Sequence, residues 1–240
     1  MNMKDMPFLD HLEILRKKLL IYLAAFLLLS VFFFISGERL LNFITAPLSG
    51  IPVSLVYIRP QEKITAYLNA SLLAGFIFSF PLLVIQIAHF IFPALKKEEK
   101  ISFFFVTLFV ILLFITGSAF AYMFLLPFAC SFFFSFSAGD GIYPLWSVGT
   151  YVELASALIF IIGCVFQAPL PVLFMVKTGV IDKVFLRKFR RHVLIAVFII
   201  SAVITPPDIY TQAAVGTVLY MLYEITIFLS GFLTTGRGKT

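Results

Sequence analysis

Long apolar stretches separated by short charged segments constrain this chain more than any other feature of its sequence. Most of them reach the roughly 17 to 25 apolar residues that an α-helix needs to cross the hydrocarbon core of a bilayer. They are continuous, whereas a membrane β-barrel would show short segments of alternating polarity. We therefore expect membrane-spanning helices. The apolar runs cover residues 19–35, 64–92, 101–136, 148–176, 192–204 and 209–233.

The composition also requires a lipid environment. The chain is 61% hydrophobic and only 12% charged, which is more apolar surface than a water-soluble domain of 240 residues can bury. Its start, MNMKDMPFLDHLEILRKK, is charged and amphipathic and does not resemble a cleaved signal peptide, so we expect mature protein. The net charge of +6 comes from clusters beside the apolar runs, which predicts contact with the lipid bilayer and no nucleic acid.

The distribution of basic residues predicts six spans with both termini in the cytoplasm. That topology places 15 of the 18 Lys and Arg residues on the cytoplasmic side, as the positive-inside rule requires. The run 101–136 would be about 54 Å long as a helix, so it is either one tilted helix kinked at Pro127 or a hairpin. A hairpin would move the basic segment 177–191 outside, so one long helix is preferred.

The predicted fold is an all-α integral membrane protein with one six-helix transmembrane domain over residues 1–240 and with the last two spans short. Run 192–204 gives about 20 Å of helix, so the final hairpin either is re-entrant or thins the bilayer, and Arg237 and Lys239 in the tail favour thinning. Pro169 and Pro171 predict kinks in the fourth span. Cytoplasmic segments are expected at 1–18, 93–100, 177–191 and 234–240, and external segments at 36–63, 137–147 and 205–208.

Two acidic clusters fall on the predicted cytoplasmic side, where basic residues are the rule. They are Asp10 with Glu13, and Glu98 with Glu99. Converging carboxylates could bind the guanidinium groups of a basic peptide. Alternatively, each carboxylate pairs with a nearby cation, as Glu13 could with Arg16, for under about 0.5 kcal/mol. Composition alone favours these local pairs.

Three polar side chains lie within apolar runs: Glu153, Gln167 and Glu224. Such groups usually face a bundle interior or a wet cavity, although Glu153 could also be an interfacial anchor. They could line the site of a small-solute or ion transporter, which is the alternative function, while a purely structural scaffold would make them incidental. The sequence shows no internal repeat and no intramembrane basic partner for the carboxylates, and both absences weaken the transporter interpretation.

Catalytic, cofactor and metal sites are not indicated. The three histidines show no metal-ligand spacing, and the sequence lacks nucleotide-binding and hydrolase motifs. Cys130 and Cys164 sit inside apolar runs, so we expect both to be packing residues. The chain is not expected to be an enzyme.

The N-terminal segment Phe8-Leu-Asp-His-Leu-Glu-Ile-Leu-Arg16 resembles the amphipathic signature of TatC, the core subunit of the twin-arginine protein translocase. Each fragment alone is weak evidence for the family. Five fragments in the family's order, spread over essentially the whole chain, are specific evidence for it. The other four are Ala46-Pro47-Leu48, His89-Phe90 to Pro93-Ala-Leu95 with Glu99 behind it, Phe120-Ala-Tyr122, and Thr205-Pro206-Pro-Asp208 with Gln212.

This resemblance implies a non-enzymatic receptor in the cytoplasmic membrane that binds the twin-arginine signal peptides of folded cargo proteins. It implies single-span TatA and TatB type partners, a homo-oligomer within the receptor complex, and energy from the proton gradient. Signal-peptide binding is expected at Glu13, Arg16, Phe90, Pro93, Glu98 and Glu99. Structural, partner or transport roles are expected for Pro47, Gln167, Thr205, Pro206, Asp208, Gln212 and Glu224.

The sequence departs from the TatC pattern at two positions. Ile14 replaces the second glutamate of the N-terminal signature, so Glu13 has taken over its contact, Glu98 supplies a second carboxylate, or selectivity for twin arginines is relaxed. Adjacent helical positions point about 100° apart, so the first possibility requires a shifted helix. Gln167 stands where relatives often carry glutamate, so a proton relay there loses support.

Overall fold

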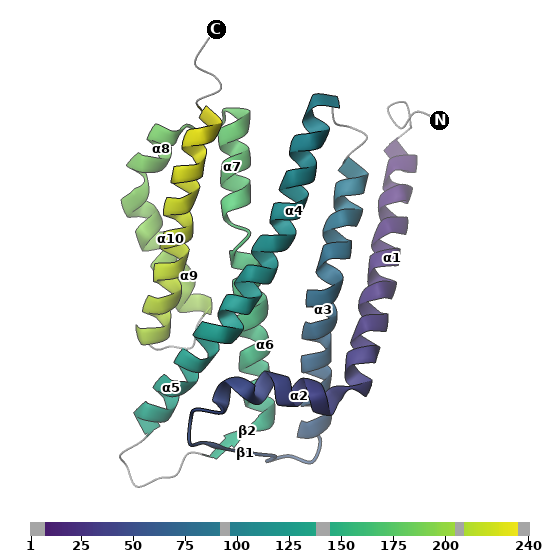
Figure 1. Cartoon of the computed structure of the whole chain (residues 1–240), viewed down its shortest axis with the longest axis vertical. Coiled ribbons are helices and arrows are strands. Elements are labelled where there is room, and N and C mark those ends of the chain that lie inside the picture. The colour runs from purple at the N-terminus through teal and green to yellow at the C-terminus, as the bar shows by residue number, and fades with distance from the viewer. Residues whose placement is uncertain (1–7, 92–96, 138–144, 205–208, 235–240) are drawn as a thin grey trace. The chain divides into compact units, whose positions relative to one another are not determined.

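The computed structural model describes residues 8–91, 97–137, 145–204 and 209–234 (Figure 1). Within these ranges the chain is almost entirely helical and divides into two compact units. Unit 1 comprises Met1–Ala46, Ser54–Ile115 and Leu145–Ser156, and unit 2 comprises Pro47–Val53, Thr116–Pro144 and Ala157–Thr240. Because both units draw on distant parts of the sequence, long-range contacts hold each of them together.

Unit 1 is built on two long helices, α1 (Phe8–Ile35) and α3 (Glu62–Ile91), which lie side by side (Figure 1). Gly75 of α3 meets Ser30 of α1 so closely that a Cβ atom at position 75 would overlap the serine side chain and backbone. Small residues of this kind let two membrane helices approach each other closely. The described part of the amphipathic segment, residues 8–18, is not separate, because it forms the first turns of α1.

The segment predicted as the external loop 36–63 contains regular structure that the sequence analysis did not foresee. Helix α2 (Gly37–Thr45) starts two residues after α1, and a 3-10 turn, η2 (Ala46–Leu48), follows it. Strand β1 (Ser54–Val56) pairs in parallel with β2 (Leu145–Ser147), which lies in the predicted loop 137–147. Parallel pairing needs a long crossover connection, and here most of the connecting chain forms α3 and the helices after it.

The run 101–136 forms one continuous helical segment, so the prediction of one long helix in place of a hairpin is confirmed. It comprises α4 (Lys97–Phe120), a π-helical turn η4 (Ala121–Leu125) and α5 (Leu126–Ser137). The π turn ends two residues before Pro127, the predicted kink. Proline has no backbone N–H for the helical ladder, and a local change of helix type accommodates this loss. The predicted loop 93–100 is shorter than expected, since α4 already begins at Lys97.

The fourth apolar run is interrupted at the predicted prolines. Helix α6 (Val148–Val165) ends in a turn, and α7 (Pro169–Thr178) begins with Pro169 in its first turn. Gly179 ends α7 in the left-handed conformation (φ 81°). The predicted loop 177–191 then contains a further helix, α8 (Lys183–Lys188).

The final hairpin consists of a short helix and a long one. Helix α9 (Arg190–Ile204) has 15 residues, or about 22 Å, which confirms a short fifth apolar helix. Helix α10 (Ile209–Thr234) has 26 residues, or about 39 Å, so the prediction that the last span is short is wrong. Its helix continues to the end of the apolar run without a breaking proline. The predicted turn 205–208 lies outside the described residues.

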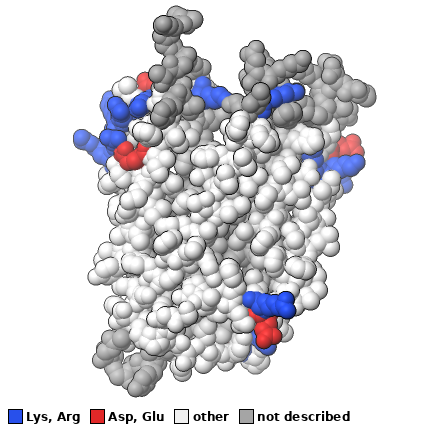
Figure 2. Space-filling view, viewed as in Figure 1, with Lys and Arg blue, Asp and Glu red and all other residues white. Residues whose placement is uncertain are grey.

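Five helical segments within the described ranges are long and apolar enough to cross a membrane, and α9 is not among them. Large apolar side chains are exposed on both units, including Leu28 at 72% and Val203 at 82%. Figure 2 shows a face with few charged residues over most of its area. Such a surface is unfavourable in water but suits a hydrocarbon solvent. The chain is a multi-pass membrane protein.

Candidate functional site

The predicted peptide-binding residues that the structure describes lie at one end of unit 1. Figure 1 shows that the start of α1, the end of α3 and the start of α4 lie at this end. Glu13 and Arg16 are exposed near the start of α1, and Phe90 is half-buried near the end of α3. Glu98 and Glu99 belong to the first turn of α4, where the helix dipole favours acidic residues. Pro93 lies outside the described residues.

The surface of α1 beside these residues contains a mostly apolar groove. It has a volume of about 310 Å³ and is lined by Leu15, Arg16, Leu19, Leu20 and Leu23. Ile14 is half-buried, whereas Glu13 is exposed, so the two neighbouring positions present different surroundings. Within the described part of the chain, Glu13 forms no ion pair with Arg16 or Lys17. The local pairing that composition favours is therefore not found for this carboxylate.

A second polar site in unit 1 was missed by the sequence analysis. Glu62, in the first turn of α3, is only 7% exposed and its carboxylate accepts four hydrogen bonds. Two come from the backbone N–H groups of Ile58 (2.7 Å) and Arg59 (3.1 Å). The others come from the Ser147 hydroxyl and the Gly149 N–H, the latter at 2.7 Å. We call these five residues the Glu62 junction, because they join the start of α3 to the start of α6.

The surroundings of the Glu62 junction fix its geometry. A Cβ atom at Gly149 would lie 2.7 Å from Cγ of Glu62, so only glycine leaves room for the carboxylate. Close by in the sequence, the buried Tyr151 hydroxyl donates to the Ile44 carbonyl at the end of α2 (2.8 Å). A cavity of about 400 Å³ adjoins the junction, and its lining includes Arg59 and the exposed Glu153. The sequence did contain one signal for this site: Pro60 followed by Glu62, just before the apolar run 64–92, is typical of the start of a helix.

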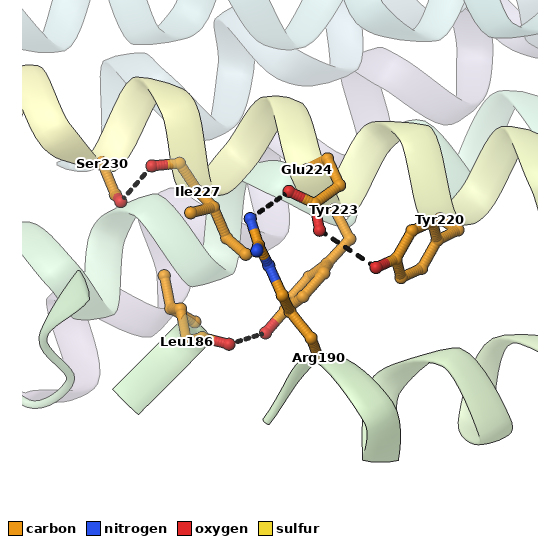
Figure 3. Close-up of polar contacts among 7 residues, drawn as sticks. All are labelled: Leu186, Arg190, Tyr220, Tyr223, Glu224, Ile227 and Ser230. Carbon is orange, nitrogen blue, oxygen red and sulfur yellow. Dashed lines mark hydrogen bonds and ion pairs between the residues drawn. The ribbon is translucent and has the colours of Figure 1, made fainter. Parts of the chain in front are cut away.

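The main polar site of unit 2 is an ion pair between the final two helices. Arg190, the first residue of α9, donates from Nη2 to Oε2 of Glu224 on α10 at 2.6 Å. Figure 3 shows Arg190 reaching this carboxylate, whose other oxygen accepts a bond from the Tyr220 hydroxyl at 3.1 Å. The sequence predicts no intramembrane basic partner for the carboxylates in apolar runs, and the partner found for Glu224, Arg190, belongs to the predicted cytoplasmic segment 177–191. The α9–α10 hairpin brings together two residues 34 positions apart.

The remaining predicted site residues belong to α10, to the turn between α6 and α7 and to η2, or lie outside the described residues. Gln212 of α10 donates to the Phe198 carbonyl of α9 (3.1 Å), so it contributes to the same hairpin. Gln167 is half-buried in the turn between α6 and α7, and Pro47 is half-buried in η2. Cys130 is buried as predicted, but Cys164 is exposed. Thr205, Pro206 and Asp208 lie outside the described residues.

Comparisons with known proteins agree over most of the chain. The profile of the family described as "Sec-independent protein translocase protein (TatC)" matches residues 10–217. A protein of that name from Carboxydothermus hydrogenoformans is 31% identical over 234 residues, covering 97% of this chain and 96% of the relative. Another from Aquifex aeolicus is 35% identical over 237 residues, covering 98% of each. A crystal structure described as the twin arginine translocase receptor TatC in DDM has a TM-score of 0.79 and 34% identity, covering 92% of this chain and 99% of that one.

Proposed function

Because the chain belongs to the TatC family of Sec-independent protein translocase proteins, we propose that it binds twin-arginine signal peptides and nucleates a complex that exports folded proteins across the cytoplasmic membrane. The family consists of translocase components and not of enzymes. The chain accordingly acts by binding and by organising partners in the membrane. No bond in the cargo is made or broken by it.

One observation carries the assignment of the binding site. The exposed Glu13 on α1 lies at the same end of unit 1 as the acidic first turn of α4, which contains Glu98 and Glu99. Two guanidinium groups need two or more carboxylate partners, since each presents a planar fork of N–H donors. Arg16 and Phe90 border this acidic end, and Pro93 belongs to the segment between α3 and α4.

In this proposal the groove on α1 binds the apolar part of the signal peptide, next to the site of the arginines. The groove on α1 offers the side chains of Leu15, Leu19, Leu20 and Leu23, and it begins next to Arg16. An extended or helical apolar stretch could continue into it directly from the acidic end. In this arrangement the carboxylates recognise the arginines, and the groove binds the hydrophobic stretch without sequence specificity.

The chain crosses the membrane six times in this proposal, with α9 as a short fifth span and both termini in the cytoplasm. About 22 Å of helix is less than a hydrocarbon core of about 30 Å, so the bilayer thins beside α9. Single-span TatA and TatB type subunits, and further copies of this chain, assemble on the exposed apolar faces. Pro47, Gln167 and the segment from Thr205 through Pro206 and Asp208 to Gln212 serve structure or partner contacts.

The transporter alternative is less well supported. It needs carboxylates in apolar runs that are available to a solute or ion. Glu224 is instead engaged by Arg190 and Tyr220. Of these two carboxylates, Glu153 alone meets the requirement, because it is exposed and lines the cavity in unit 1. Export of folded proteins therefore remains the leading function.

Photo-crosslinking tests the proposed site. A crosslinker is placed at position 13, 14, 98 or 99 and exposed to a twin-arginine signal peptide or to the same peptide with both arginines changed to lysine. Lysine keeps the charge but lacks the planar fork. Position 38, exposed on α2 in the same unit, is the matched control. Arginine-dependent crosslinks at positions 13, 98 or 99 support the proposal, and equal crosslinks to both peptides would refute it.

A further inference from the structure

Helix α8 is held firmly by one of its faces. Leu186 is 4% exposed and packs in a core with Val176 of α7 and Ile227 of α10. The Tyr223 hydroxyl of α10 donates to the Leu186 carbonyl at 2.7 Å. The Asp182 carboxylate caps the helix by accepting the Phe185 N–H at 2.6 Å. These contacts fix which side chains of this short helix are presented outward.

The outward side chains are of two kinds, apolar and basic. Val180 and Val184 are 69% and 72% exposed, and Phe185 is 44% exposed. The Phe185 ring stacks on Phe189 with centroids 4.2 Å apart. Arg187, Lys188 and Arg191 are exposed on the same segment. We call Val180, Val184, Phe185, Arg187, Lys188 and Arg191 the α8 surface.

The charge of the α8 surface is not balanced by its neighbours within the described part of the chain. Arg190, which lies between the basic residues, is engaged by Glu224, but the ion pairs found there involve none of Arg187, Lys188 and Arg191. The nearest carboxylate in sequence, Asp182, already caps α8. The surface therefore carries three positive charges next to exposed apolar side chains.

A bilayer interface satisfies both halves of this surface. Exposed valine and phenylalanine side chains are unfavourable in water, and lysine and arginine are unfavourable in hydrocarbon. A bilayer interface accepts both, with the rings at the acyl boundary and the cations among the headgroups. Helix α8 is separated from α9 by Phe189 alone and packs on the membrane helix α10, so such an interface lies within its reach.

We infer that the α8 surface binds the phosphate headgroups of anionic glycerophospholipids. The guanidinium groups of Arg187 and Arg191 can hold a phosphate through paired hydrogen bonds, and Lys188 adds a third charge. The apolar side chains contact the first carbons of the acyl chains. An acidic protein segment would match the charges but would leave Val180, Val184 and Phe185 without a hydrocarbon partner, so lipid is the occupant.

Native mass spectrometry of the full-length chain tests this inference. The protein is purified with equal amounts of phosphatidylglycerol and phosphatidylcholine, and the ratio of retained adducts is measured. Each Lys or Arg near an anionic surface contributes roughly fivefold in affinity. The variant R187Q/K188Q/R191Q should therefore lower the phosphatidylglycerol to phosphatidylcholine ratio by at least about tenfold. The control R39Q/R59Q/K63Q removes the same charge from unit 1 and should leave the ratio unchanged.

Two outcomes would overturn the inference. An unchanged ratio in the α8 variant would leave the surface to an acidic protein segment, and an equal fall in both variants would indicate a general charge effect. If the triple variant does not purify as a folded protein, the single variants R187Q, K188Q and R191Q replace it. Each should lower the ratio several-fold, and no change in any of them would equally refute lipid binding.

Discussion

Glu62, at the start of α3 in unit 1, and Glu224, within α10 in unit 2, are both acidic residues of apolar helices, but the protein holds them in opposite ways. Glu62 is buried and is satisfied by four neutral donors, three of them backbone N–H groups. Glu224 is 34% exposed and is satisfied by a cation and a phenol. The Glu62 carboxylate mainly binds backbone N–H groups of separate segments, whereas the Glu224 carboxylate binds two side chains.

This difference predicts how much each unit depends on its carboxylate. Removing Glu62 takes away the acceptor of three backbone N–H groups at once, and backbone groups are less free than a long side chain to turn toward another partner. Removing Glu224 leaves a long, half-exposed arginine that can reach water or headgroups. Unit 1 should therefore be sensitive to the exact side chain at position 62, while unit 2 should tolerate changes at positions 190 and 224.

The substitution Glu62→Ala should have the largest effect. It removes the acceptor for Ile58, Arg59, Ser147 and Gly149 at once, so we expect the thermal unfolding midpoint in detergent to fall on the order of 5 °C or more. Glu62→Gln should also be destabilising, because an amide offers only one acceptor oxygen. The control is Glu38→Ala, an exposed residue of the same unit, which should change the midpoint little. Equal midpoints for both alanine variants would contradict the proposed role of the Glu62 junction.

The substitution Gly149→Ala should have the next largest effect. The new Cβ would lie 2.7 Å from Cγ of Glu62, and forcing extra volume into such a site costs about 1–3 kcal/mol. Gly50→Ala is the matched control, since nothing lies within 4 Å of a Cβ at that position. Chemical denaturation of both variants measures the difference. If Gly149→Ala unfolds like Gly50→Ala, the carboxylate does not occupy the position described.

Breaking the Arg190–Glu224 ion pair should have a smaller effect. Both side chains are partly exposed, 46% and 34%, and such pairs contribute about 0–1 kcal/mol. Glu224→Gln and Arg190→Gln should each lower the unfolding midpoint by no more than a few degrees. The exchange R190E/E224R should recover part of that loss. A loss several times larger would indicate that the pair lies in hydrocarbon, where an unpaired charge is costly.

The features that the sequence predicted were those encoded locally. Continuous apolar runs predicted α3 and the long helix from α4 to α5, and Pro127 and Pro169 predicted the interruptions, because proline acts on its own turn of helix. The resemblance to TatC added the order of motifs and the family. The acidic residues at one end of unit 1 followed from their positions at helix ends.

The features that the sequence did not predict depend on residues far apart. Strand β1 pairs Ser54 with Leu145, and Glu62 bonds to Gly149 across 87 positions, so no local pattern marks either contact. The pair of Arg190 and Glu224 was missed because the two residues belong to different apolar runs. Helix α8 was predicted as loop because six residues with three basic side chains do not form an apolar run, although Gly179 and Asp182 mark its approach and its cap.

The substitution Tyr220→Phe should have the smallest effect and is the sharpest test of the comparison. It removes one hydroxyl donor from Glu224 while Arg190 keeps the other oxygen, so we expect a change below about 1 kcal/mol. Ser147→Ala likewise removes one hydroxyl donor from Glu62, but there the carboxylate is buried, and the Thr150 N–H and hydroxyl also lose the Ser147 oxygen as their acceptor at 3.2 Å. Ser147→Ala should therefore destabilise the protein more than Tyr220→Phe in the same denaturation assay. The reverse order would mean that the burial of Glu62 does not make it more dependent on its hydroxyl donor than Glu224 is.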